Sequence, residues 1–238
     1  MVALRPRPRG RQLHVHRRHT DLFYVLDGEL EVRLGVGDEP VAVPAGMLAR
    51  VPPLVVHGFR NGSDADVRYL NFHAPGCDFA DFLRALRDDR SFSYDQHPPP
   101  ADGGRPTTDA VVGSDGFVHQ RPGLRMALLA DVDEIAIAET SAEGDEQPPP
   151  HMHRAHVESF YVLEGAVTLT AAGRELRAEA GTWLQVPPGV PHALAFPGER
   201  PARFLDIHTP NYGFGAFLRD LDGAQSDAAP AGFDQVPA

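Results

Sequence analysis

Two stretches of this chain carry histidines at the same spacing. Residues 14–28 read HVHRRHTDLFYVLDG and residues 151–165 read HMHRAHVESFYVLEG. In each copy two histidines are one residue apart, and an acid follows five residues after the second histidine. A lone histidine, His57 or His192, closes a later run that contains glycine or proline. Three imidazoles and one carboxylate form a typical ligand set for a transition metal.

The two copies therefore provide two candidate metal sites. Nitrogen-rich ligation with one carboxylate suits Fe, Mn, Ni, Cu, Co or Zn rather than Ca or Mg. Only neutral imidazole binds a metal, so we expect occupancy to fail as the pH falls through the histidine range. The candidate ligands are His151, His153, Glu158 and His192 in the later copy, and His14, His16, Asp21 and His57 in the earlier one.

Strands and tight turns must bring these side chains together. Side chains alternate across a strand, so His151 and His153 project from one face. Glu158 follows after a four-residue loop, on the next expected strand. His192 comes directly after Pro187-Pro188-Gly189, a sequence that predicts a tight turn aiming the imidazole inward.

Two further blocks repeat and extend this pattern over most of the chain. GMLARVPPLVVH at 46–57 matches GTWLQVPPGVPH at 181–192, and HAPGCDFADFLR at 73–84 matches HTPNYGFGAFLR at 208–219. Residues 29–34 and 167–170 alternate polar and apolar side chains, as strands do, and 78–89 and 213–221 predict short amphipathic helices. With 23 Gly and 23 Pro in 238 residues, the chain is expected to be all-β, with two tandem barrels.

The boundaries that we predict are an N-terminal barrel at 1–90, a Pro/Gly-rich linker at 91–108, a C-terminal barrel at 109–223 and a loose tail at 224–238. Three strand candidates precede His151, at 111–120, 125–130 and 134–140. Only thirteen residues, six of them Arg or Pro, precede the first motif histidine. The first barrel is therefore expected to lack its opening strands, and an upstream segment, the linker side or a partner subunit could close that edge.

The motifs resemble those of the cupin superfamily. The first is His-x-His, four residues, Glu, six residues, Gly, and the second is Gly, five residues, Pro-x-Gly, two residues, His. The matching positions are His151, His153, Glu158, Gly165, Gly181, Pro187, Gly189 and His192. The resemblance implies a bicupin of the quercetin 2,3-dioxygenase-like type, built from two double-stranded β-helix (jelly-roll) barrels.

In that family the three histidines and the glutamate bind one divalent transition metal, which implies a metal in the C-terminal barrel. The N-terminal barrel is a second candidate, with two departures from the pattern. Asp21 is one methylene shorter than the expected glutamate, and Leu54 replaces the motif glycine.

Alternation along the strands also predicts the lining of a substrate pocket. Phe160 and Val162 share a face with Glu158, and Leu194 and Phe196 share a face with His192. The C-terminal pocket is therefore expected to be apolar. Trp183 is interpreted as barrel core, and the repeated pairs His19/His156 and His73/His208 as hydrogen-bonded structural histidines.

The leading functional hypothesis is a metal-dependent oxygenase acting on an aromatic or enolisable small molecule. A metal held in this way can bind a deprotonated substrate oxygen and O₂ side by side. Glu158 would be a ligand and, on loosening, the base that takes the substrate hydroxyl proton. Two alternatives remain open: a metal-dependent isomerase or cyclase of a sugar or polyketide, and a non-catalytic small-molecule-binding protein. The substrate and the native metal are not legible.

Composition limits the remaining classes of partner. A net charge of −11 argues against nucleic acid, which needs clustered positive charge. Cys77 is the single cysteine, so no intramolecular disulfide is expected. No apolar stretch approaches the roughly 18 residues of a membrane span, and no signal peptide is legible; we therefore expect a cytoplasmic protein. The resemblance implies a homodimer paired through sheet edges.

Overall fold

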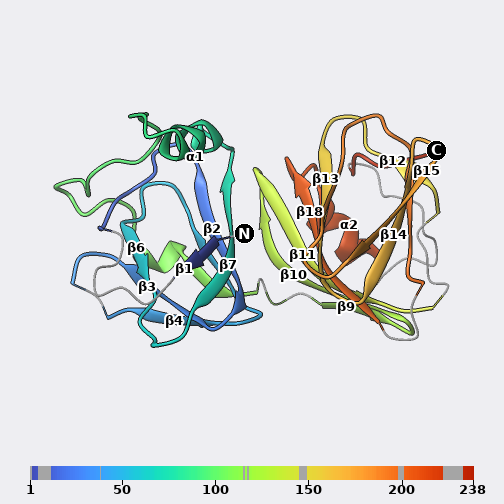
Figure 1. The fold of residues 1–238 in the computed structure, drawn as a ribbon, viewed down its shortest axis with the longest axis horizontal. Helices are drawn as coiled ribbons and strands as arrows, with labels where there is room; N and C mark the ends of the chain where they lie inside the picture. Colours follow the sequence, from blue (N-terminus) through green and yellow to red (C-terminus); the bar gives the residue numbers. More distant parts are fainter. Residues whose placement is uncertain are drawn as a thin grey trace. The chain divides into compact units, whose positions relative to one another are not determined.

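The structure, a computed structural model, forms two compact units, Met1–Gly113 and Ser114–Ala238. It describes residues 2–4, 12–37, 39–114, 116, 118–144, 149–197, 201–221 and 233–238. Each unit is built from two β-sheets with one short α-helix (Figure 1). The expectation of an all-β protein with two tandem jelly-roll units is confirmed.

The first unit has a five-stranded sheet and a three-stranded sheet. In spatial order the larger sheet contains β1 (Val2–Leu4), β7 (Val67–Ala74), β2 (Thr20–Asp27), β5 (Leu48–Val51) and β8 (Val111–Gly113). The smaller sheet contains β4 (Val41–Pro44), β3 (Glu29–Leu34) and β6 (His57–Arg60). The 3₁₀ turn η1 (Thr107–Asp109) and the helix α1 (Phe79–Arg87) complete the unit.

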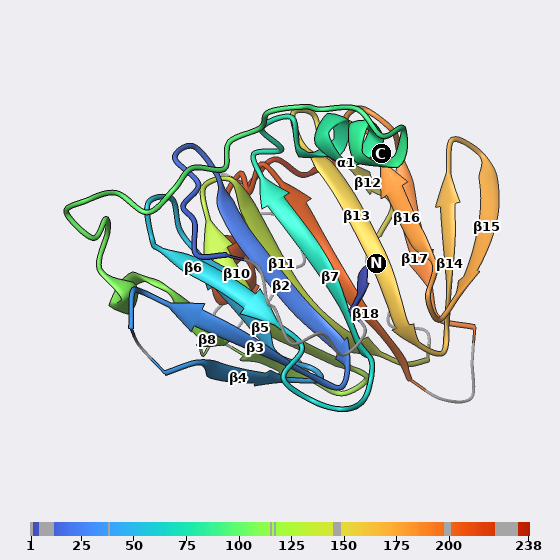
Figure 2. The ribbon, with the colours of Figure 1, turned by 60° about the vertical axis from the view of Figure 1, so that its left-hand side comes forward.

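The second unit repeats this plan with longer sheets. One sheet contains β16 (Trp183–Val186), β13 (Val157–Glu164), β18 (Ala202–Thr209), β11 (Ile135–Ala142), β10 (Leu124–Val132) and β9 (Val118–Arg121). The other contains β15 (Arg174–Glu179), β14 (Ala166–Ala171), β17 (His192–Ala195), β12 (His151–Met152) and β19 (Val236–Pro237). The helix α2 (Phe214–Leu221) follows β18, and the strands of both units are seen again in Figure 2.

The two units differ at the start of the larger sheet. β1 pairs with β7 as β11 pairs with β18, but the second unit continues beyond β11 to β10 and β9. Within the described residues the first unit has no counterpart of these two strands, as the short N-terminal segment led us to expect. β8 joins the opposite side of the sheet by pairing with β5.

The division between the units differs from the predicted one. The segment 111–120, which we expected to be one strand of the second barrel, is split between β8 of the first unit and β9 of the second. Residues 91–108, interpreted as a linker, belong to the first unit. The physical reason is pairing: Val15 and His97 form a β-bridge with two backbone hydrogen bonds of 2.9 Å.

The last residues of the chain are likewise part of a sheet. β19 pairs with β12, so 233–238 are not the loose tail that their composition suggested. The rest of that predicted tail, 224–232, lies outside the described residues.

Each unit has its own buried apolar cluster between its sheets. Phe23, Leu30 and Val51 belong to the cluster of the first unit, and Phe160 and Val162 to that of the second. Trp183 does not: it is 44% exposed, because it begins β16, which lies at the edge of its sheet. Neither α-helix among the described residues has the length and apolar composition needed to cross a bilayer.

A motif glycine at equivalent positions of the two units permits the same tight turn between two strands. Gly165 connects β13 to β14 with a φ of +71°, and a Cβ there would lie 3.1 Å from the carbonyl oxygen of Pro201. Gly28 connects β2 to β3 in the same way, with a φ of +78°. A residue with a side chain would therefore meet both backbone strain and a steric clash.

Candidate metal centres

Four buried side chains of the second unit converge on one point. The ligand atoms of His151, His153, Glu158 and His192 all lie within 4.8 Å of one another. Glu158 Oε2 is 2.5 Å from His192 Nε2, 3.0 Å from His153 Nε2 and 3.8 Å from His151 Nε2. The four residues predicted from their spacing thus come from β12, the loop that follows it, β13 and β17, and the structure brings them together.

The backbone fixes the direction in which each imidazole presents its lone pair. Nδ1–H of His151 donates to the carbonyl of Pro149 at 3.0 Å, and that of His192 donates to Val190 at 2.9 Å. Nδ1–H of His153 donates to the carbonyl of Asp234 at 2.7 Å. Neutral rings with Nδ1 protonated have a lone pair on Nε2. Three lone pairs and one carboxylate that face each other repel unless a cation lies between them, so the site fits a metal ion.

Sheet pairing and one turn produce this convergence. His151 of β12 is directly opposite His192 of β17. The amide of Gly189 donates to the carbonyl of His153 at 2.6 Å, and Gly189 has a φ of +77°. The tight turn that the sequence predicted thus also ties the strand that follows it to the His-x-His segment.

The first unit contains an equivalent centre. His14, His16, Asp21 and His57 are buried, with ligand atoms within 4.8 Å of one another. Asp21 Oδ2 is 3.5 Å from His16 Nε2 and 3.4 Å from His57 Nε2, so the shorter acid still reaches the histidines. The Nδ1 atoms of His14, His16 and His57 donate to the carbonyls of Gln12, Asp95 and Val55.

The hydrogen bonding of the histidine nitrogens also indicates that the first centre fits a metal. His16 Nε2 and His57 Nε2 are buried without a hydrogen-bond partner, which is costly for polar atoms unless a ligand satisfies them. Leu54, at the place of the motif glycine, has a left-handed φ of 67°. The turn therefore keeps its shape in spite of the substitution.

Electrostatics favour ionised acids at both centres. Burial acts to raise the pKa of Glu158, but the surrounding imidazoles of His151, His153 and His192 outweigh it and hold the pKa well below its usual range. Burial likewise acts to raise the pKa of Asp21, but the nearby imidazoles of His16 and His57 outweigh it and lower the pKa. Anionic acids beside neutral imidazoles are the state that a divalent cation needs.

Buried histidines should make the metal-free protein sensitive to acid. Burial, followed by neighbouring histidines, lowers the pKa of His14 and that of His156 to about 4. Both rings are neutral in the folded state, whereas the unfolded chain binds protons below about pH 6.5. Their contribution to stability is therefore complete above pH 6.5 and is lost as the pH falls toward 4.

We expect the free energy of unfolding of metal-free protein, measured by denaturant titration, to fall over this window by about 1.4 kcal/mol per pH unit for each such histidine. A free energy that stays level between pH 6.5 and 4.5 would contradict the burial of neutral rings.

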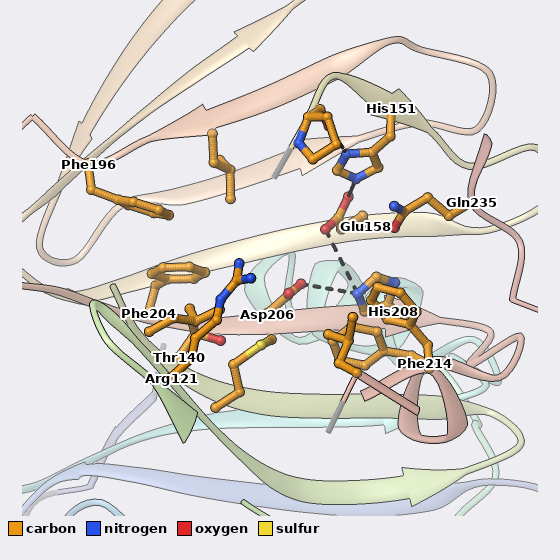
Figure 3. A pocket seen from close by; sticks show the side chains of 16 residues that line it. Arg121, Thr140, His151, Glu158, Phe196, Phe204, Asp206, His208, Phe214 and Gln235 are labelled. Carbon is orange, nitrogen blue, oxygen red and sulfur yellow. Dashed lines mark hydrogen bonds and ion pairs between the residues drawn. The ribbon is translucent and has the colours of Figure 1, made fainter. Parts of the chain in front are cut away.

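A pocket of about 120 Å³ opens onto the second centre. His151 and Glu158 line one part of it, and Phe196 and Phe204 line another (Figure 3). Of the four predicted pocket residues, Leu194 and Phe196 line this space. Phe160 and Val162 are instead fully buried in the apolar cluster behind it. The lining is mainly aromatic and aliphatic, and polar side chains lie beside the phenylalanines as well as at the metal centre (Figure 3).

Five polar residues of this pocket, Arg121, Thr140, Asp206, His208 and Gln235, escaped the sequence-based site prediction. Thr140 Oγ1, Asp206 Oδ1 and His208 Nε2 are buried without a hydrogen-bond partner, and all three residues line the pocket. His208 Nε2 is 3.2 Å from Asp206 Oδ1 and 3.8 Å from Glu158 Oε1 (Figure 3). The repeated pair His73/His208 marked His208 in the sequence, but only the β13–β18 register places His208 and Asp206 opposite Glu158 and Phe160.

Asp206 marks a difference between the units, because Asn71 is at the equivalent position of the repeat. Burial and the nearby charge of Glu158 raise the pKa of Asp206, although His208 opposes this rise. A carboxyl whose folded pKa is raised stabilises the protein at low pH, and this stability is lost as the pH rises through that pKa. We expect Asp206→Asn to increase the free energy of unfolding at pH 7, because the amide carries no charge to be buried there.

The reverse change, Asn71→Asp, is the matched control. Asn71 Nδ2 donates to Asp21 Oδ1 at 2.6 Å, so an aspartate there would place two carboxylates in contact. Denaturant titration of metal-free protein should show a loss of about 1–3 kcal/mol. A loss of stability in Asp206→Asn at pH 7 would contradict the raised pKa of this carboxyl.

The comparisons with known proteins agree with this architecture. A family model described as Cupin domain matches residues 1–73 and 139–208. Quercetin 2,3-dioxygenase of Bacillus subtilis (strain 168) is 25% identical over 222 residues, which cover 76% of this chain and 64% of that protein. The chain thus spans slightly less than two thirds of the length of this relative.

Solved structures show the same fold at lower identity. A variant of oxalate decarboxylase from Bacillus subtilis has a TM-score of 0.58 at 17% identity, covering 96% of this chain and 77% of that one. A variant of salicylate 1,2-dioxygenase from Pseudoaminobacter salicylatoxidans has a TM-score of 0.61 at 16% identity, covering 91% and 72%. The matched residues, the repeated motifs and the two jelly-roll units together establish that this chain belongs to the cupin family, with two cupin units in tandem.

Proposed function

We propose that the second unit binds one divalent transition metal and catalyses the oxygenation of a small aromatic or enolisable molecule. The observation that carries the proposal is the position of the four donors, His151, His153, Glu158 and His192, at the end of an apolar pocket. The similarity to a quercetin 2,3-dioxygenase supports the same class of reaction. The first centre would bind a second metal through His14, His16, Asp21 and His57.

A transition metal in this site would supply Lewis acidity toward a substrate oxygen and reactivity toward O₂. The protein supplies the remaining parts. Glu158 is ionised, and its Oε2 contacts two imidazoles that lower its basicity. When such a contact loosens, the carboxylate can take up a substrate hydroxyl proton at Oε2. Phe196 and Phe204 are stacked with ring centroids 5.8 Å apart, and they offer a flat apolar wall that excludes water from a planar ligand.

Oxygen uptake is the direct test. Protein loaded separately with Fe²⁺, Mn²⁺, Ni²⁺, Cu²⁺ and Co²⁺ would be incubated with flavonols, diketones and catechols in an oxygen electrode. We expect uptake with at least one metal and one substrate class, and no uptake by protein stripped with a chelator. An absence of uptake in every combination would contradict the oxygenase.

A further sample loaded with Zn²⁺, tested beside these, separates the two alternatives that the sequence left open. Conversion of a sugar or polyketide by the Zn²⁺ form, without oxygen, would indicate an isomerase or cyclase. Binding of these compounds in calorimetry without any turnover would indicate a small-molecule-binding protein.

A further inference from the structure

A short segment outside the known motifs occurs once in each unit. Residues 94–98 read YDQHP, and residues 233–237 read FDQVP. We propose that these segments, here named the clasp segments, hold the metal-binding histidines in place, with Asp95 and Asp234 as positioning residues. The inference rests on the proposed metal binding, but not on the proposed oxygenase activity.

The backbone of each clasp segment contacts one metal ligand directly. The carbonyl oxygen of Asp95 accepts a hydrogen bond from Nδ1 of His16 at 2.5 Å, and that of Asp234 accepts one from Nδ1 of His153 at 2.7 Å. The chain separations are 79 and 81 residues. In both units the second histidine of His-x-His therefore depends on the clasp segment for its tautomer and ring orientation.

The carboxylate of each clasp segment holds the loop between that histidine and the acidic ligand. Asp95 accepts hydrogen bonds from the amides of Arg17 and Arg18, the latter at 2.7 Å, and from Nδ1 of His19 at 3.0 Å. Its side chain is almost fully buried. These contacts constrain residues 17–19, which connect His16 to Asp21.

Asp234 makes the same contacts in the second unit. Its carboxylate accepts a hydrogen bond from the amide of Ala155 at 2.6 Å and one from Nδ1 of His156 at 3.1 Å. Burial alone would raise the pKa of Asp234, but the amides of Ala155 and Arg154 lower it overall. An ionised acceptor makes the stronger, charge-assisted kind of hydrogen bond.

The contact continues through a second histidine to the pocket. Because His156 donates Nδ1–H to Asp234, its Nε2 accepts from Nδ1–H of His208 at 2.8 Å. The first unit has the same link between His19 and His73, at 2.7 Å. The ring of His156 also packs on that of His153 at a centroid distance of 4.2 Å. One aspartate thus orients a ligand histidine, its loop and the histidine that lines the pocket.

Cobalt titration of single-site proteins tests this role. Each centre is assayed in the full chain, with the other centre disabled by His57→Ala or His192→Ala. Co²⁺ binding is followed through the visible absorption of the bound ion. We expect Asp234→Ala to weaken Co²⁺ binding by the second unit about 10–100-fold and to change the shape of the spectrum. Asp95→Ala should do the same in the first unit.

Matched variants distinguish positioning from loss of the fold. Asp234→Asn keeps an acceptor oxygen for the amides and should recover part of the affinity, and it replaces Asp234→Ala if that variant does not fold. Asp220→Ala, an exposed acid on α2, should leave both affinity and spectrum unchanged. Asp234→Ala should also leave Co²⁺ binding by the first unit at its original affinity.

The possible results separate the clasp segments from the proposed function. Folded Asp234→Ala protein with unchanged Co²⁺ affinity and spectrum would overturn the positioning role, as would equal weakening at both centres. Strong, clasp-dependent Co²⁺ binding in a protein that consumes no oxygen would support the positioning role while the oxygenase fails. Absence of Co²⁺ binding in the unmodified protein would overturn both.

Discussion

Glu158→Gln should lower the turnover number by about 10²–10⁴-fold, the range lost when a positioned acid or base is removed. Glutamine has nearly the same size, so the apolar pocket keeps its shape. The substitution removes the negative charge that faces three Nε2 lone pairs, and an amide cannot take up the substrate proton. Oxygen uptake under saturating substrate measures the loss, while calorimetry should show the dissociation constant of the substrate within a few-fold of its original value.

Asp21→Asn is the matched control, since Asp21 is the equivalent acid of the first unit. If the reaction takes place only in the second unit, this variant should retain its oxygen uptake. Equal losses of oxygen uptake in the two variants would indicate that both units carry out the reaction. Full turnover in Glu158→Gln would exclude the carboxylate from the chemistry.

His192→Ala should reduce the metal content from two atoms per chain to one and abolish oxygen uptake. His192 provides the donor closest to Glu158, at 2.5 Å, and its removal leaves two imidazoles and a carboxylate. Because metal binds the folded state, loss of a metal present at 1,000 times its dissociation constant should also lower stability by about 4 kcal/mol. Elemental analysis and thermal unfolding of gently purified protein measure the two effects.

His57→Ala provides the comparison within the same chain. It should remove the metal of the first unit and leave oxygen uptake by the second unit intact. An unmodified protein that contains one metal per chain, unaffected by His57→Ala, would identify the first centre as a scaffold. A His192→Ala protein that still contains two metals would contradict the proposed ligand set.

Local spacing was sufficient to predict which donor side chains lie together at the two candidate metal centres. His-x-His on a strand, an acid five residues on and a histidine after a turn are short-range relations, and each is governed by strand alternation or by the φ angle of a glycine or proline. The same alternation placed Leu194 and Phe196 on the pocket. It failed for Phe160 and Val162, because both faces of β13 are buried and alternation alone does not tell a pocket from a core.

The clasp segments show what local patterns cannot supply. Their resemblance is limited to five positions, and their offset of 139 residues (234 − 95) differs from that of the other repeats. Composition led us to interpret one segment as a linker and the other as a loose tail. Their role comes from hydrogen bonds that join residues about 80 positions apart, and no periodicity along the chain records such a contact.

Residue order alone thus dictated the fold class, the repeat and the donor types, since these follow from contacts between near neighbours along the chain. Long-range packing decided which segments orient the donors and which side chains reach the pocket. It also decided the different surroundings of Asp206 and Asn71, which are at equivalent positions of the repeat. Those features depend on distances between residues of different strands, and these distances are fixed only when the whole barrel has formed.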